Sequence, residues 1–120
     1  MWNAPSKELL DRIPRLYETE NIPLEQKNIY VHFFLIGSDW FVAEFNGDDL
    51  FWGFVVLHGD FRNAEWGFFS LKELQQIQVA GMYEVEYELE EYWKIRPAAE
   101  VELIRIANGW PRIKKLPATP

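Results

Sequence analysis

Hydrophobic and polar residues alternate most regularly between Tyr83 and Glu90. The odd-numbered positions in this segment are apolar or aromatic, and the even-numbered ones are Glu84, Glu86, Glu88 and Glu90. A two-residue period is typical of a β-strand with one face in the core and the other in water. The sequence therefore predicts a strand whose solvent face carries a row of carboxylates.

Three further strands are predicted from apolar runs at residues 29–36, 40–45 and 50–57. The first run is apolar at both parities, which favours a central strand that is covered on both faces. The turn residues Gly37-Ser38-Asp39 separate the first two runs, and a strong hairpin signal at residues 46–49 separates the second from the third. These three strands should be antiparallel neighbours.

Short helices are predicted at both ends of the chain. Ser6 is a candidate N-cap for a first helix in which Leu9, Leu10 and Ile13 have helical spacing, and Pro14 ends that helix. Near the other end, a proline at the first helical position and a glycine after residue 108 indicate a final helix over residues 98–107, although Val101-Glu102-Leu103 leaves the type of this segment open.

A fourth strand and a middle helix are predicted between these segments. Residues 64–69 form the strand, and Ser70 with Glu73 makes a capping box for a helix over residues 71–78. Leu71, Leu74 and Ile77 would then face the sheet.

The predicted fold class is α+β: a single domain with a mainly antiparallel five-stranded sheet and short helices packed on one face. Residues 1–28 would form the N-terminal helix and a connecting segment, residues 29–110 the sheet and remaining helices, and residues 111–120 a flexible basic tail.

Composition agrees with one self-sufficient core. The 120 residues are 48% hydrophobic and include six Trp, most of which we expect in the core or half-buried. The absence of Cys excludes disulfides and thiolate chemistry. Neither a secretion signal nor an apolar run of membrane-spanning length is recognisable, so a cytoplasmic location is expected.

Charge is distributed unevenly. The net charge is −7, with seven Glu over residues 84–102 and only bases from residue 105 onward. Such a chain repels a phosphate backbone, so direct nucleic-acid binding is disfavoured except through the basic tail at Arg112, Lys114 and Lys115. We therefore expect the partner to be another protein.

A family resemblance rests on residues 30–74. The matching positions are Trp40, Glu44, Gly53, Gly59 and the run Glu65-x-Gly67-Phe68-x-Ser70-Leu71-x-Glu73-Leu74. This pattern resembles a family of small bacterial proteins, a domain of unknown function found on plasmids and integrative elements near antirestriction and conjugation genes. The family's Glu-Arg-Asp-like cluster after the fifth strand is replaced here by Glu90-Glu91-Tyr92-Trp93. The resemblance implies a fold and a genomic setting, and it brings no reaction, cofactor or catalytic residue.

The acidic row is the first candidate site. Carboxylates at alternate positions of a strand stand about 6.8 Å apart, which is too sparse to imitate DNA unless Glu91, Glu100 and Glu102 join them. A solvated strand face explains the same pattern. Trp66, Phe68, Tyr92 and Trp93 could instead rim a partner-binding groove, and their burial in the core is the alternative.

A possible pocket is the second candidate. Trp40, Glu44 and Glu65 lie in the predicted strands, and two carboxylates facing one cleft could perform acid–base chemistry. The alternative is that each carboxylate points outward or accepts hydrogen bonds from turn amides. His32, His58 and Glu44 would form a metal site only if all three shared a face, so no metal or cofactor is predicted.

The expected function is that of a non-enzymatic cytoplasmic accessory protein, which binds another protein in a mobile-element setting of defence or antirestriction. A small hydrolase-like or ligand-binding domain that uses Glu44 and Glu65 is the alternative.

Overall fold

The computed structural model describes residues 2–112, which form an α+β domain built on a five-stranded antiparallel sheet. In chain order the elements are α1 (Lys7–Asp11), η1 (Leu24–Gln26), β1 (Asn28–Ile29), β2 (Val31–Leu35), β3 (Ser38–Phe45), β4 (Leu50–Val56), β5 (Glu65–Ser70), α2 (Leu71–Gln76), β6 (Gln78–Val79), β7 (Tyr83–Glu84), β8 (Glu86–Tyr87), β9 (Arg96–Pro97), η2 (Ala98–Glu100) and α3 (Glu102–Asn108).

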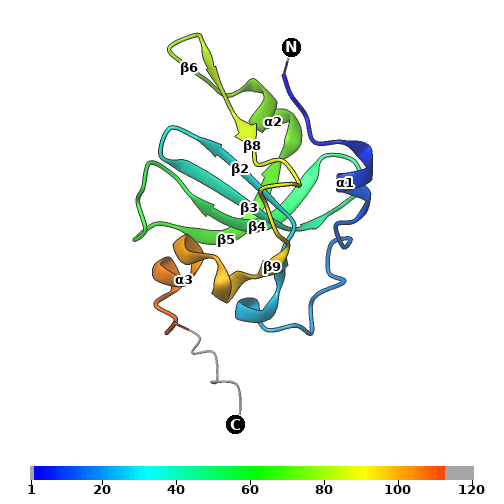
Figure 1. Ribbon diagram of the computed structural model, residues 1–120, viewed down its shortest axis with the longest axis vertical. Coiled ribbons are helices and arrows are strands. Elements are labelled where there is room, and N and C mark those ends of the chain that lie inside the picture. Colours follow the sequence, from blue (N-terminus) through cyan, green and yellow to red (C-terminus); the bar gives the residue numbers. More distant parts are fainter. Residues whose placement is uncertain (1, 113–120) are drawn as a thin grey trace.

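The strand order in the main sheet is β5-β4-β3-β2-β8, and two small two-stranded pairs, β1 with β9 and β6 with β7, flank this sheet (Figure 1). The predicted fold class is therefore confirmed.

Successive residues of the inner strands enter two separate apolar clusters, one on each face of the sheet. The first, called the α2-side cluster, receives its cover from α1, α2 and the segment before β8. Its buried members are Leu9, Ile13, Val31, Phe33, Leu35, Trp40, Val42, Phe45, Phe51, Phe69, Leu74 and Val85.

The second cluster, called the α3-side cluster, lies on the opposite face under η2 and α3. Its buried members are Ile29, Phe41, Ala43, Phe54, Val56, Trp93, Ala98, Val101 and Ile104. The prediction that the helices pack on one face is therefore wrong. A sheet whose strands are apolar at both parities must be covered on both faces, and the C-terminal helices supply the second layer.

Two strand predictions also need correction. The segment 29–36 is split at Tyr30 into β1 and β2, and β3 rather than β2 occupies the centre of the sheet. Residues 83–90 form two separate two-residue strands, and only β8 joins the main sheet. Val85 between them is buried as the alternation predicts, whereas Tyr83 is 51% exposed.

The local capping and turn predictions are confirmed. Ser6 caps α1 by accepting from the Leu9 amide, and Ser70 caps α2 by accepting from the Glu73 amide. In the β3–β4 hairpin, the Asn46 side chain accepts hydrogen bonds from the amides of Asp48, Asp49 and Leu50. Gly109 ends α3 in the left-handed conformation, at φ +69°.

All six Trp residues are buried or half-buried, as expected from the composition.

Among the helices within residues 2–112, none has the length and apolar character that a bilayer crossing requires.

A β-bulge in β3 fixes how the central strands meet. Register between β3 and β4 shifts between Val42 and Glu44, and at this point the carbonyl oxygen of Phe41 approaches Gly53. A Cβ atom at Gly53 would lie 1.8 Å from that oxygen, so the close approach requires glycine.

We predict that Gly53→Ala lowers the free energy of unfolding by about 2–3 kcal/mol, because β3 must shift to admit a methyl group. The matched control is Gly67→Ala on β5, directly opposite Gly53, where an added Cβ meets no atom within 4 Å. That variant should change stability by less than about 0.5 kcal/mol. Urea denaturation measures both, and equal losses would contradict the role given to the bulge.

A second prediction concerns Asp49, which supports the start of α2. Its carboxylate accepts from the Ser70 hydroxyl at 2.6 Å and from the Lys72 amide at 2.8 Å. The hydrogen bond from Ser70 is the main cause that lowers the pKa of Asp49 below its ordinary value of 3.8. A lowered pKa stabilises the fold above the unfolded-state value, and this stabilisation is lost as the pH falls through the folded-state value.

Asp49→Asn should therefore be less stable than the wild type near neutral pH, and the difference should shrink as the pH falls below the ordinary pKa of 3.8. Denaturant titrations of both proteins across this range provide the measurement. A difference that stays constant on acidification would show that the charge of Asp49 plays no part.

Candidate functional site

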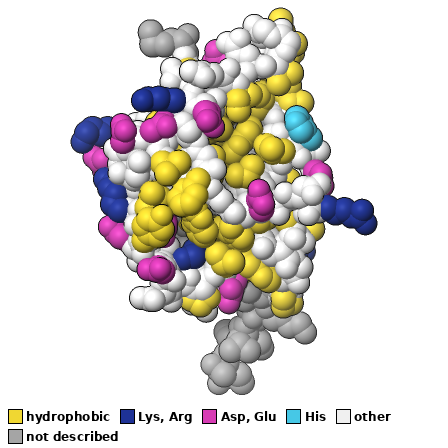
Figure 2. All heavy atoms as spheres, turned by 180° about the vertical axis from the view of Figure 1, so that it is seen from behind, with side chains coloured by type: hydrophobic (Ala, Val, Ile, Leu, Met, Phe, Trp, Pro, Cys, Tyr) yellow, Lys and Arg dark blue, Asp and Glu magenta, His cyan; other side chains and the backbone are white. Residues whose placement is uncertain are grey.

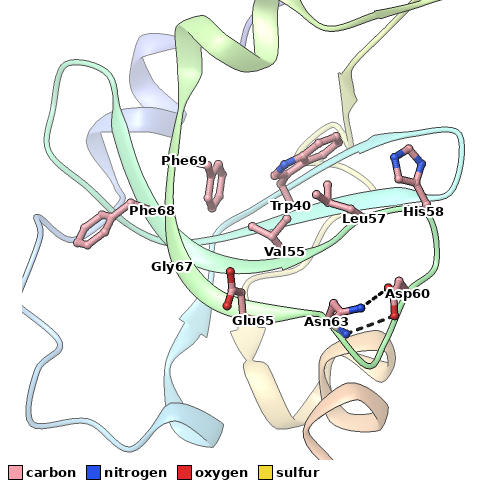
Figure 3. A pocket seen from close by; sticks show the side chains of 10 residues that line it. All are labelled: Trp40, Val55, Leu57, His58, Asp60, Asn63, Glu65, Gly67, Phe68 and Phe69. Atoms are coloured by element: carbon pink, nitrogen blue, oxygen red, sulfur yellow. Dashed lines mark hydrogen bonds between the residues drawn. The ribbon is translucent and has the colours of Figure 1, made fainter.

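A groove lies where the α2-side face of the sheet is left uncovered. Cross-strand register aligns Trp40 on β3 with Val55 on β4, and Val55 in turn with Glu65 on β5. These three residues share one face, and with Phe69 they form the floor and one side of the groove (Figure 3). The volume of the groove is about 460 Å³.

The β4–β5 loop forms the opposite wall of the groove. His58, Asp60 and Asn63 line it, and His58 adopts a positive φ of 53°. Asp60 fixes the loop, since its carboxylate accepts from the Arg62 and Asn63 amides and from the Asn63 side chain at 2.6 Å. The hydrogen bond from the Asn63 side chain is the main cause that lowers the pKa of Asp60. The wall therefore stays negatively charged at neutral pH.

Apolar surface continues beyond the groove. Phe68 on β5 points away from the groove and is 52% exposed (Figure 3). On the same face as Phe68, Trp52 and Trp66 stack with their ring centroids 5.2 Å apart. Figure 2 shows apolar side chains gathered in two areas on one side of the molecule, with acidic side chains between and around them.

The structure does not bring Glu44 and Glu65 together. Glu44 is 5% exposed and follows the bulge, so it lies on the α3-side face next to Trp52, whereas Glu65 lines the groove on the opposite face. Glu44 accepts from the Tyr17 and Thr19 amides at 3.0 and 3.1 Å and from the Thr19 hydroxyl. The alternative interpretation of Glu44, as an acceptor for turn amides, is therefore correct.

Lys27 completes this buried network. It is itself buried and donates to the carbonyl and the hydroxyl of Thr19. Its ammonium group also lies 5.5 Å from the centroid of the Trp52 ring. The network holds the segment around Tyr17 and Thr19 against β3. Because Glu44 is buried and bonded within it, this carboxylate has no access to a substrate.

The predicted acidic row is broken up. Glu88 lies 2.7 Å from the Nδ1 atom of His32, and Glu90 pairs with Arg12 at 3.2 Å. Glu84 and Glu86 remain near the surface in separate short strands, and Glu91 is exposed in the turn that follows. Two of the four carboxylates are thus engaged by cationic or imidazole partners, and the evenly spaced line needed to imitate DNA does not form.

His32 has a structural environment. Its Nε2 atom lies 2.7 Å from Asp39, so both ring nitrogens face carboxylates, and its ring stacks on Phe41 at a centroid distance of 4.5 Å. His32 therefore ties the segment after β8 to β2 and β3 on the α3-side face, whereas His58 lines the groove on the other face.

The other predicted residues are placed as follows. Trp93 is 8% exposed and donates to the Ile29 carbonyl, so it cannot contact a partner, whereas half-buried Trp66 donates to Asn108.

Within residues 2–112 no group of three or more His, Asp or Glu side chains is arranged to hold a metal ion. In the basic tail, Arg112 lies 3.8 Å from Glu102, and Lys114 and Lys115 fall outside the described residues.

Sequence reasoning missed the β4–β5 loop as a wall of the groove. The spacing Asp60-x-x-Asn63 is typical of an Asx turn. It predicts the turn itself and gives no sign of the groove beside the turn. Comparison with known proteins adds no further assignment, because no family model, curated protein or solved structure matches this chain.

We predict that Glu44→Ala lowers the free energy of unfolding by about 3 kcal/mol, because it leaves the Tyr17 and Thr19 amides without their acceptor. Glu65→Ala is the matched control on the groove side and should change stability by less than about 0.5 kcal/mol. Thermal and urea denaturation measure both variants. A similar loss in the two would refute the assignment of Glu44 as a buried anchor.

Proposed function

We propose that this protein is a non-enzymatic protein-binding domain that docks a partner on the groove and the neighbouring strand β5. The observation that carries the proposal is the groove itself: Trp40, Val55 and Phe69 form its floor, and the exposed apolar side chains of Leu57 and Phe68 adjoin it. Exposed apolar surface next to a polar rim is typical of a partner site.

The chemistry of the groove favours binding over catalysis. Its ionisable residues are His58, Asp60 and Glu65, and Asp60 is already occupied by three hydrogen bonds within its own loop. Glu44, the second carboxylate that acid–base chemistry would need, lies on the other face of the sheet. The hydrolase-like alternative therefore lacks its pair of carboxylates.

The biological setting is proposed from the family resemblance alone. The resemblance supports an accessory role in mobile-element defence or antirestriction, in the cytoplasm and with another protein as the partner. The net charge of −7 also disfavours direct binding to nucleic acid.

The test compares the wild type with a variant whose groove is filled by a larger side chain, and measures how well each binds a captured partner. Gly67 lines the groove, and a Cβ atom there meets nothing within 4 Å, so Gly67→Leu should fold normally while filling the groove. We expect this variant to lose at least about tenfold of the affinity for a captured partner. Affinity purification followed by titration of the captured protein gives the measurement.

The control reverses charge at the opposite edge of the sheet. Glu86→Lys on β8 and Glu91→Lys in the following turn should leave the captured partner bound. If charge reversal abolishes binding and Gly67→Leu does not, the acidic segment and not the groove is the binding site, and the proposal is wrong.

A further inference from the structure

Strand β5 forms a free edge of the main sheet. It pairs with β4 over six consecutive residues, Glu65–Ser70, and has no second strand neighbour within residues 2–112. The opposite edge differs, because β8 contributes only two residues there. One long edge therefore has a row of backbone donors and acceptors without a strand partner within residues 2–112.

This edge lacks several of the features by which proteins usually prevent strand pairing. Edge strands are commonly shortened, bulged, or interrupted by Pro and Lys. The β5 sequence Glu-Trp-Gly-Phe-Phe-Ser contains neither Pro nor Lys, and its register with β4 is regular throughout. An unprotected edge of this length is suited to accept another strand.

The side chains next to the edge match the two faces of an added strand. On the groove face, Gly67 leaves open space between Glu65 and Phe69. On the other face, Phe68 is exposed and lies next to the stacked Trp52 and Trp66. Side chains of a strand alternate between the two faces of a sheet, so an added strand would contact both of these surfaces. Apolar side chains on the added strand would fit the groove on one face and Phe68 on the other.

Charge identifies the kind of strand that fits. Four acidic residues lie around β5: Asp60 and Glu65 near its beginning, and Asp49 and Glu73 near its end. They outnumber the two bases in the same region, Arg62 and Lys72. The whole chain carries −7, so a second copy would be repelled at long range, whereas a cationic segment would be attracted.

We propose that β5 takes up an extended, lysine- or arginine-containing segment of another protein as a sixth strand of the sheet. Backbone hydrogen bonds to β5 hold the segment, a small apolar side chain enters the groove beside Gly67, and a basic side chain pairs with Glu65. This inference rests on the proposed function, since it names the class of partner for the same surface.

The test is selection of a random twelve-residue peptide library displayed on phage against the full chain. Enriched peptides should carry Lys or Arg two positions away from a small apolar residue, because the side chains next to Glu65 and Gly67 share one face. A synthetic copy should slow hydrogen exchange of the β5 amides, and N-methylation at alternate residues of that copy should weaken binding at least about tenfold by removing the backbone donors. Glu65→Lys should weaken binding roughly fivefold.

The inference would be overturned by no enrichment, by enrichment of acidic peptides, or by equal binding of the N-methylated copy. Dimerisation through β5, seen by analytical ultracentrifugation and abolished by Gly67→Leu, would identify a second copy as the occupant and would also overturn it. The proposed function fails separately, because it requires only that a captured protein partner is lost when the groove is filled.

Discussion

The structure depends on one constraint: its central strands are apolar on both faces, so the sheet must be covered twice. Phe33 and Phe41 belong to neighbouring strands, point to opposite faces and are almost completely buried. Short helices provide both covers, α1 and α2 on one face and η2 and α3 on the other. On the α2 side the cover ends before it reaches Val55 and Gly67, and the groove is what remains uncovered.

Sequence rules predicted the elements that depend on neighbouring residues. The caps at Ser6 and Ser70 and the turn at Asn46 were predicted because each is decided within about four residues by side chains that bond the local backbone. The strand over residues 83–90 was predicted as one element but is divided. Its alternation is real, yet Glu88 is bound by His32 and Glu90 by Arg12, and these long-range partners are not visible in the local pattern.

The candidate site was predicted only in part, and one residue explains most of the difference. Trp40 and Glu65 do share the groove, whereas Glu44 does not, although an unbroken strand would place residues 40, 42 and 44 on one face. The bulge after Val42 reverses this parity and turns Glu44 toward Thr19. Nothing in the run from residue 40 to residue 45 distinguishes a bulged strand from a regular one, so the separation of the carboxylates depends on tertiary structure.

The bulge also has an evolutionary consequence. The bulge inserts one extra residue, Ala43, between Val42 and Glu44, which pair with the adjacent residues Gly53 and Trp52 of β4. Deletion of Ala43 would therefore restore a regular ladder and keep both pairs, so homologues that lack this one codon would still carry Glu44 on the side opposite to Glu65. A lineage could in this way lose the bulge in one genetic step and retain its internal anchor.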